Sequence, residues 1–248
     1  MSAIYILWLR QLKRYFRSRS RIIGSLAQPL LFLLALGFGF GPIYQRAGGG
    51  NYIEFLTPGV IAMSIIFTAI FSGIEIIWDK QFGFLKETLV APVSRLNIML
   101  GRTLGGATVA SLQGIIVFLI SFIVGFRPVS LILLPLALIF IVLTALLFTA
   151  VGTAIASILE DMQGFQLIMN FLVMPLFFLS GALFPLQGLP KALITVAQLD
   201  PLSYSVDGLR GTLANGAHFG VPVDFTVLTI VAAFFLATGS YLFFKIEI

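Results

Sequence analysis

The chain has 248 residues, of which 59% are hydrophobic and only 10% are charged, with 15 Lys and Arg against 10 Asp and Glu. A mean hydropathy of +1.06 and 25 Phe residues indicate a membrane protein, and we expect no nucleic-acid partner. The chain contains no cysteine, which excludes disulfides, thiolate nucleophiles and cysteine metal sites.

The basic N-terminal segment 1–21 is predicted to contain an amphipathic helix over residues 4–17. At about 100° per residue, six apolar side chains share one face of this helix: Ile4, Leu7, Trp8, Leu12, Tyr15 and Phe16. The opposite face carries Arg10, Lys13, Arg14 and Arg17. We expect this helix to lie in the membrane interface, with its basic face toward anionic headgroups. It is either a simple anchor or a surface that grips a partner protein.

Six apolar runs are long enough to cross a bilayer as helices: 22–41, 56–78, 104–125, 129–158, 165–186 and 223–244. The first run is too long for the core of a signal peptide, so we interpret it as a retained helix. The fourth must tilt, kink at Pro135 or project beyond the bilayer. No remaining segment could form a soluble domain, so residues 1–248 are predicted to be one all-α membrane domain.

Polar residues are rare within the predicted spans. Ser64, Thr68, Ser72 and Glu75 fall within an arc of about 80° on the second one. The hydroxyls either line a substrate path or allow close helix packing. Glu75 is a functional candidate because an ionisable group in a span is costly, and its expected partner is Lys80 or a basic residue of the N-terminal helix such as Arg17. Asn170, in the fifth run, is a weaker candidate for the path.

The segment 79–103 joins the second and third runs and begins with the sequence DKQFGFLKETLVAPVSR. Phe82, Leu85 and Leu89 are spaced to form a narrow apolar stripe on a short helix. Pro92 ends that helix, and Ser94 can cap the next one. A bare loop does not need an apolar stripe, so we expect it to dock into a groove on another protein.

Residues 187–222 are predicted to form two short helices before the last run. Leu189, Leu193, Val196 and Leu199 make one apolar stripe. Asp200 and Pro201 then begin a second helix, on which Leu202, Val206, Leu209 and Leu213 recur at helical spacing. Both pieces are too short to span, so they are interfacial or re-entrant. The pair Asp207 and Arg210 is interpreted as a surface ion pair of little energetic weight.

The basic residues indicate the orientation. Eleven of the 15 Lys and Arg lie in the N-terminal segment, in 79–103 and at the C-terminus. By the positive-inside rule, both termini and 79–103 face the cytoplasm, and 187–222 lies outside. The chain is therefore expected in a cell inner membrane.

The sequence offers no catalytic motif. It contains no Gly-Lys pair, so a Walker A phosphate loop is excluded, and its one histidine, His218, lacks a metal-ligating constellation. We expect no enzyme activity and no cofactor or metal bound by this chain.

Three features together resemble the type-two exporter permeases of ABC transporters: the basic amphipathic N-terminus, EIIWDKQFGFLKETLVAPVSRLNIMLGR (75–102) and FLSGALFPLQGLPKALITVAQLDPLSYSVDGLRG (178–211). The resemblance covers essentially the whole chain. It implies a six-span permease that dimerises and binds a separate ATPase subunit, which holds ATP and Mg. The middle block would contain the coupling helix that sits on the ATPase, and the last block would re-enter the membrane from outside.

The resemblance also assigns roles to individual residues. Glu75 matches the family's acidic residue at the end of the second span, and the coupling pattern matches Phe82, Gly83, Leu85, Glu87 and Pro92. Leu89 joins this set through the apolar stripe. One departure is DKQFG, where the family often has an Arg-rich stretch and a Thr after the glycine; here Phe84 follows.

The expected function is therefore that of a homodimeric export permease for a hydrophobic drug-like, lipid or glycolipid substrate. The alternative is an ATP-independent carrier or a membrane scaffold, and co-purification of an ATPase subunit distinguishes the two.

Overall fold

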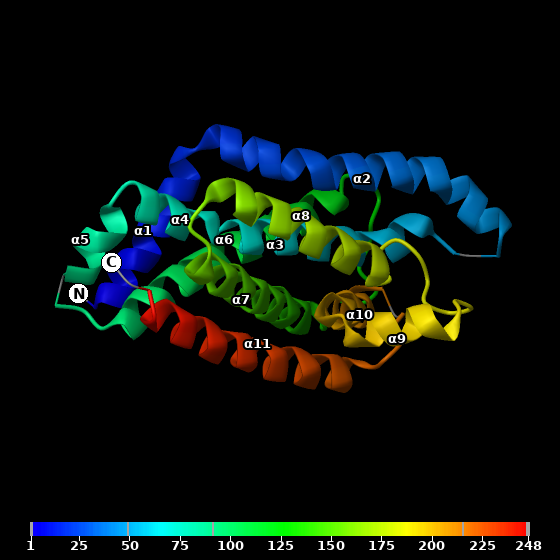
Figure 1. Ribbon diagram of the computed structural model, residues 1–248. Coiled ribbons are helices and arrows are strands. Elements are labelled where there is room, and N and C mark those ends of the chain that lie inside the picture. The colour runs from blue at the N-terminus through cyan, green and yellow to red at the C-terminus, as the bar shows by residue number, and fades with distance from the viewer. Residues whose placement is uncertain (1, 49, 91, 215, 247–248) are drawn as a thin grey trace.

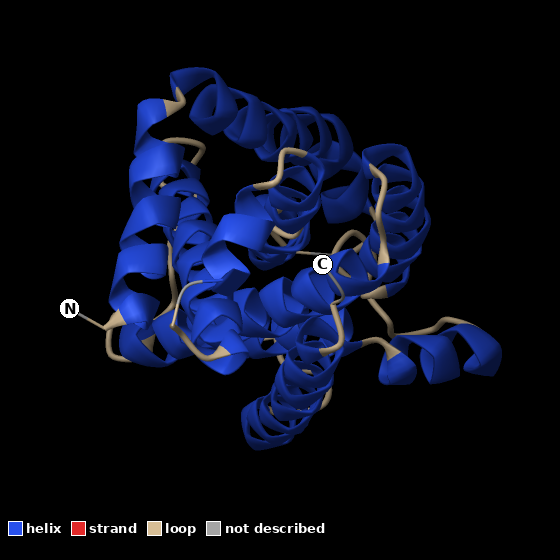
Figure 2. Ribbon diagram, turned by 60° about the vertical axis from the view of Figure 1, so that its left-hand side comes forward, coloured by secondary structure: helices blue, strands red, loops and turns tan. Residues whose placement is uncertain are grey.

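The computed structural model describes residues 2–48, 50–90, 92–214 and 216–246, which contain helices and no strand (Figures 1 and 2). The helices are α1 Ala3–Arg17, α2 Arg19–Arg46, α3 Tyr52–Phe71, α4 Ile74–Gln81, α5 Phe84–Val90, α6 Arg95–Ser121, α7 Leu134–Ile158, α8 Met162–Leu179, α9 Lys191–Leu199, α10 Pro201–Leu213 and α11 Val221–Phe244.

The long helices run side by side, and the short ones gather at the two ends of the bundle. Figure 1 shows α1, α4, α5 and both chain ends at one end, and α9 and α10 at the other. Helices α3, α6 and α7 pack against one another at the centre. Helix α2 is largely exposed along its most apolar window, of which only 17% is buried, and its outer face therefore meets lipid or another protein.

Within the described residues, six helical stretches are long and apolar enough to cross a membrane, which confirms the predicted number. They are Ile22–Arg46, Tyr52–Gln81, Arg95–Ser121, Leu134–Ile158, Met162–Leu179 and Val221–Phe244. The chain is a multi-pass membrane protein.

The second run was expected to be one helix, but a break at Ser72 and Gly73 separates α3 from α4. The break lies where this segment crosses α7. A Cβ on Gly73 would collide with the carbonyl of Gly152, and a Cβ on Gly152 would lie 2.5 Å from the carbonyl oxygen of Ile70. Two glycines thus let the backbones touch.

The fourth run neither kinks at Pro135 nor projects as a helix. Pro135 lies in the first turn of α7, where proline needs no hydrogen-bond partner, and residues 129–133 precede the helix. The N–H of Val129 is instead satisfied by the carbonyl of Leu213 in α10. The predicted 30-residue run is therefore a 25-residue helix preceded by an irregular apolar segment.

The fifth run, predicted over 165–186, is also shorter than expected. Helix α8 ends at Leu179, and residues 180–190 are irregular. This irregular stretch packs on the start of α3. The Tyr52 hydroxyl donates to the carbonyl of Leu183 at 3.1 Å, and Gly59 lies directly against Ala182. The buried carbonyl of Leu183 thus finds a side-chain partner in place of a helical one.

Candidate functional site

The N-terminal helix α1 packs against protein rather than lying free on the membrane. Leu7 and Tyr15 of its apolar face are buried, and the Trp8 indole donates to Thr108 of α6 at 3.0 Å. The close approach depends on two glycines of α6: a Cβ on Gly101 would lie 2.9 Å from Cβ of Leu7, and one on Gly105 would lie 2.6 Å from Cγ of Gln11. The expectation that this whole face enters lipid is therefore wrong, although Phe16 remains exposed.

Two acidic residues of α4 face two basic residues of α1. Glu75 lies 3.6 Å from Arg14, and Asp79 lies 3.2 Å from Arg10. Each pair of like charges is spaced i, i+4, so each shares one face of its helix and the two faces can meet. Both carboxylates are buried. The partner expected for Glu75 was Lys80 or a basic residue of the N-terminal helix such as Arg17, and the structure places a basic residue of that helix there, namely Arg14.

Asp79 has a second partner that the sequence reasoning missed. Arg102, on α6, donates to it at 2.5 Å, and both side chains are buried. Removing either partner would leave an uncompensated charge in a low-dielectric environment. The pair therefore fixes α4 against α6 at the ends of the segment 79–103.

Lys80 fixes the same helix to α7. Its ammonium group donates to the carbonyls of Ala156, Ser157 and Leu159 at 2.9–3.1 Å. These carbonyls belong to the C-terminal end of α7, where a helix leaves acceptors unsatisfied and carries partial negative charge. Lys80 is thus a C-terminal cap for α7.

The short helix α5 protrudes at this end of the molecule. Gly83 joins it to α4 in a left-handed conformation, with φ of +79°, which only glycine adopts without strain. Phe82 is 69% exposed and Val90 is 81% exposed, whereas Leu85 is 2% exposed. The predicted stripe of Phe82 and Leu85 is therefore wrong: Phe82 precedes the turn at Gly83, so helical spacing does not carry across to Leu85.

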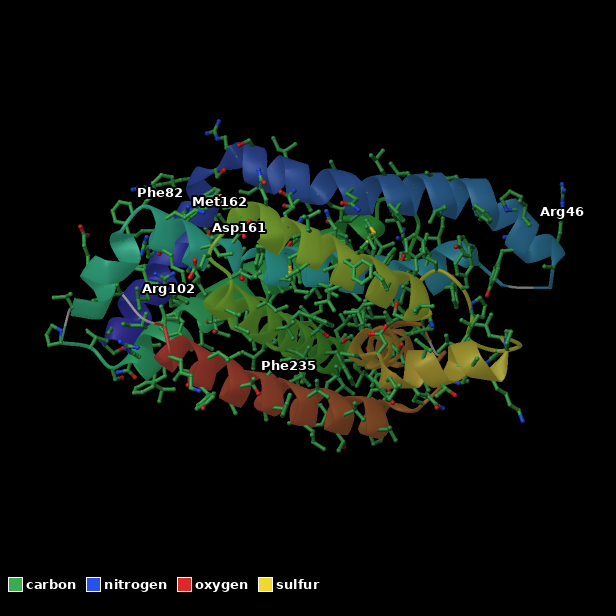
Figure 3. The ribbon with its side chains drawn as sticks, viewed as in Figure 1. Arg46, Phe82, Arg102, Asp161, Met162 and Phe235 are labelled. Atoms are coloured by element: carbon green, nitrogen blue, oxygen red, sulfur yellow. The ribbon has the colours of Figure 1, made fainter. Side chains whose placement is uncertain are left out.

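The remaining residues of the predicted coupling set lie around α5. Phe84, Glu87 and Pro92 are exposed, and Ser94 caps α6 by accepting from the N–H of Asn97 at 3.3 Å, as predicted. The side chain of Leu89 lies outside those that the structure describes. Among the described side chains of α5 and of the turn before it, Phe82, Phe84 and Val90 are the exposed large apolar ones (Figure 3 labels Phe82).

A cavity of about 310 Å³ lies among α1, α2, α3, α4 and α6. All four polar residues predicted on the second run line it: Ser64, Thr68, Ser72 and Glu75. Sequence reasoning missed the polar residues that α1 and α2 contribute: Gln11, Tyr15, Ser20, Ser25 and Gln28. Ser64 and Ser72 donate to carbonyls of their own helix, which leaves their oxygens as acceptors toward the cavity. Asn170 is exposed on α8 and does not line this cavity.

A family profile, described as ABC-2 type transporter, matches residues 2–214 of the chain. The chain belongs to the ABC-2 type transporter family. Membership implies pairing with an ABC ATPase subunit, and it confirms the family resemblance drawn from the three sequence features.

Individual relatives cover nearly the whole of this ABC-2 permease. It is 31% identical to Nodulation protein J of Rhizobium leguminosarum bv. trifolii over 239 residues, which are 95% of this chain and 88% of that protein. It is 31% identical to Nodulation protein J of Rhizobium meliloti (strain 1021), over 88% of this chain and 84% of that protein. A putative transport permease ycf38 of Porphyra purpurea is 30% identical over 81% of this chain and 70% of its own length.

At the other end of the ABC-2 permease, α10 is buried between α3, α7 and α11. Asp200 caps it as predicted, accepting from the N–H of Leu202 at 2.7 Å. Burial raises the pKa of Asp200 to about 8, although the hydrogen bond from the N–H of Leu202 opposes the rise. The apolar stripe of α10 is buried, whereas Leu193, Val196 and Leu199 of α9 are exposed.

Asp207 and Arg210 do not form the predicted surface pair, because both are buried and each has other partners. Asp207 accepts from the backbone N–H groups of residues 218–220 at 2.6–3.4 Å and holds the chain where it enters α11. Arg210 donates to the carbonyl of Gly181 at 3.0 Å, and its guanidinium lies 4.0 Å from the centre of the Phe55 ring. Burial lowers the pKa of Arg210 to about 10. Both residues therefore join α10 to its surroundings. His218 contributes a backbone donor here, and the described residues contain no cluster of metal-ligating side chains.

Proposed function

We propose that this ABC-2 permease is the membrane subunit of an ATP-driven exporter, in which two copies form the pathway and a separate ATPase subunit binds ATP and Mg. The observation that carries the proposal is the protruding helix α5. It exposes Phe82, Phe84 and Val90 at one end of the molecule. An exposed aromatic cluster on a short, rigidly held helix is a surface for burial against a partner.

The contacts behind α5 suit it for transmitting a force. A push on α5 reaches α4 through the turn at Gly83, and α4 is fixed to α6 by Asp79 and to α7 by Lys80. Movement of the ATPase would therefore displace α4 and the ends of two central spans as one unit. The two conformational states of the permease would then differ in their contacts with the ATPase. That difference is what lets the ATPase shift the populations of the two states.

The proposed orientation places α1, α5 and both termini in the cytoplasm and residues 187–222 outside a cell inner membrane. The basic asymmetry of the sequence supports it, and all three elements of the proposed cytoplasmic side lie at one end in Figure 1. In this orientation the cavity next to Glu75 opens at the cytoplasmic half of the bundle, between α1 and the first two spans.

The substrate we propose is a hydrophobic drug-like molecule, a lipid or a glycolipid. The cavity combines apolar walls, including Met63, Phe67 and Val109, with hydroxyl and amide groups from three helices. Such a lining suits a molecule that has an apolar body and a hydrogen-bonding end.

Purification with a tag on this chain from its native membrane tests the proposal. It should retain a second protein that carries a Walker A sequence, and proteoliposomes containing both should couple ATP hydrolysis to vectorial transport. An ATP-independent carrier or a scaffold would transport without ATP or not at all, and would retain no ATPase.

A further inference from the structure

A strongly basic surface lies where α1 meets α2, and neither the ion pairs of α4 nor the exposed aromatic cluster accounts for it. We name it the α1–α2 corner, and it consists of Lys13, Arg14, Arg17, Ser18, Arg19 and Ser20. These residues line one part of an open groove of about 1160 Å³ between α1 and the α4–α5 segment. A smaller cavity of about 380 Å³ is lined by Arg14, Ser18, Ser20 and Trp78. The corner is therefore a concave site with a positive lining.

Arg14 pairs with Glu75, but the other positive charges of the corner have no counter-charge among the residues that the structure describes. Among the described residues, Asp79 is the single acidic one that lines the groove, and it already binds Arg10 and Arg102. In the part of the chain that the structure describes, Lys13, Arg17 and Arg19 have neither an ion pair nor a side-chain hydrogen bond, and all three are exposed. Three cationic side chains thus line one groove without an ion-pair partner of their own.

The other groups of the corner are hydrogen-bond donors as well. Ser18 stands at the start of α2, but its hydroxyl forms no cap to the helix. The first turn of α2 contains no acidic residue. The Trp78 ring, over which the Arg14 guanidinium lies at 5.2 Å, closes the inner wall. Guanidinium, ammonium and hydroxyl donors of this kind match the several acceptor oxygens of a phosphate group.

The position of the corner relative to the membrane indicates which phosphate-bearing molecule can reach it. The first candidate span begins at Ile22, only a few residues beyond Arg19 and Ser20. The corner therefore lies where the chain enters the membrane, at the depth of lipid headgroups. Phe82 and Phe84 line the other part of the same groove, and α5, which begins at Phe84, lies at the end of the molecule in Figure 1.

We propose that the α1–α2 corner binds the phosphate of an anionic phospholipid from the leaflet against which α1 lies. The bound headgroup bridges Arg17 and Arg19 on either side of Ser18, and so holds the angle between α1 and α2. Because Arg14 belongs both to the corner and to the ion pair with Glu75, the lipid also supports the contact between α1 and α4.

Native mass spectrometry of the purified permease, without any ATPase, tests the proposal. The protein is released from nanodiscs that contain phosphatidylglycerol and phosphatidylcholine in equal amounts, and the retained lipids are counted. The wild type should retain phosphatidylglycerol selectively. The triple variant K13Q/R17Q/R19Q should bind it more weakly, by about fivefold for each charge removed. The control triple R46Q/K191Q/K245Q removes the same charge at exposed sites away from the corner and should match the wild type.

Two further variants and one ligand complete the design. The charge-conserving variant K13R/R17K/R19K should retain phosphatidylglycerol, and single Arg17→Gln serves if the triple variant does not fold. Equal retention by the Gln triple and its control would overturn the proposal. So would millimolar inorganic phosphate displacing the lipid, because the site would then serve soluble phosphate. The Gln triple variant can also be tested separately for co-purification of an ATPase subunit. If it kept its lipid but lost the ATPase, the corner would belong to the partner protein, and the proposal would equally be overturned.

Discussion

Asp79 and Arg102 lie 23 residues apart in the sequence and are joined by a 2.5 Å hydrogen bond between buried charged groups. The pair brackets the segment that carries α5. One end of that segment is thereby fixed to the other, and a partner that moves α5 must move α4 and α6 with it.

Asp79→Asn should destabilise the protein strongly, because Arg102 would remain buried without a counter-charge. We expect a loss of about 3–5 kcal/mol in the free energy of unfolding, measured by thermal or denaturant unfolding in detergent. Arg10→Gln is the matched control, since Arg10 is 42% exposed and its pair with Asp79 should contribute under about 1 kcal/mol. Equal effects of the two variants would contradict the role given to Arg102.

Glu75→Gln should reduce export while the protein still inserts, because the amide keeps the shape but loses the charge that attracts Arg14. The exchange E75R/R14E should restore part of the transport, measured per unit of membrane-inserted protein. An exchange of Glu75 with Arg17 should not, because the structure places Arg14 at this carboxylate. If the Glu75→Gln variant transported as well as the wild type, the charge of Glu75 would not be needed and the residue would have only a packing role.

The packing of α1 on α6 can be tested at Gly105. Gly105→Ala should separate the two helices, because the new Cβ would lie 2.6 Å from Cγ and 2.7 Å from Cβ of Gln11, and overpacking costs about 1–3 kcal/mol. Gly24→Ala is the control, since a Cβ at this helical position meets nothing within 4 Å. Limited proteolysis of the N-terminal segment should become faster in the first variant alone. Faster cleavage in both would show that any added methyl group disturbs the helices.

How far the sequence predicts this structure depends on the kind of contact. Length and hydropathy are enough for the six spans, and local chemistry is enough for the caps at Ser94 and Asp200. The pairing of Asp79 with Arg102 is set by where α6 packs, which no local pattern encodes. Leu85 was misplaced because the left-handed turn at Gly83 interrupts the helical period.

The pair Asp207 and Arg210 shows the same limit at the other end. Their spacing suits a pair on an exposed helix face, and the sequence alone does not reveal that α10 is surrounded by other helices. Once buried, each group needed a partner, and irregular backbone supplied them at residues 218–220 and at Gly181. The presence of α10 was predictable, but its burial was not.

Asp200 should make stability depend on pH. Its pKa is about 8 in the folded protein and about 4 when unfolded, so the folded state favours the neutral acid. The stabilisation is complete below about pH 4 and is lost as the pH rises through about 8. Asp200→Asn retains the cap oxygen for Leu202 and should flatten this dependence between pH 5 and pH 9 in thermal unfolding. An unchanged pH profile in the variant would show that another group is responsible.

The exposed aromatic residues of α5 should determine binding of the ATPase. Phe82→Asp and Phe84→Asp should abolish its co-purification without affecting insertion, because the introduced charge must be desolvated in the interface. Phe82→Leu and Phe84→Leu keep an apolar side chain and should retain most of the binding. Normal retention of the ATPase by both Asp variants would exclude this surface as the docking site.

The most direct measurement is cross-linking from single cysteines, which this cysteine-free chain allows without background. A cysteine at Phe84 should cross-link to the ATPase subunit, because the account places α5 in the interface between the two proteins. A cysteine at Leu199, 80% exposed on α9 at the other end of the bundle, should not. Cross-linking from Leu199 and none from Phe84 would contradict both the proposed orientation and the coupling role of α5.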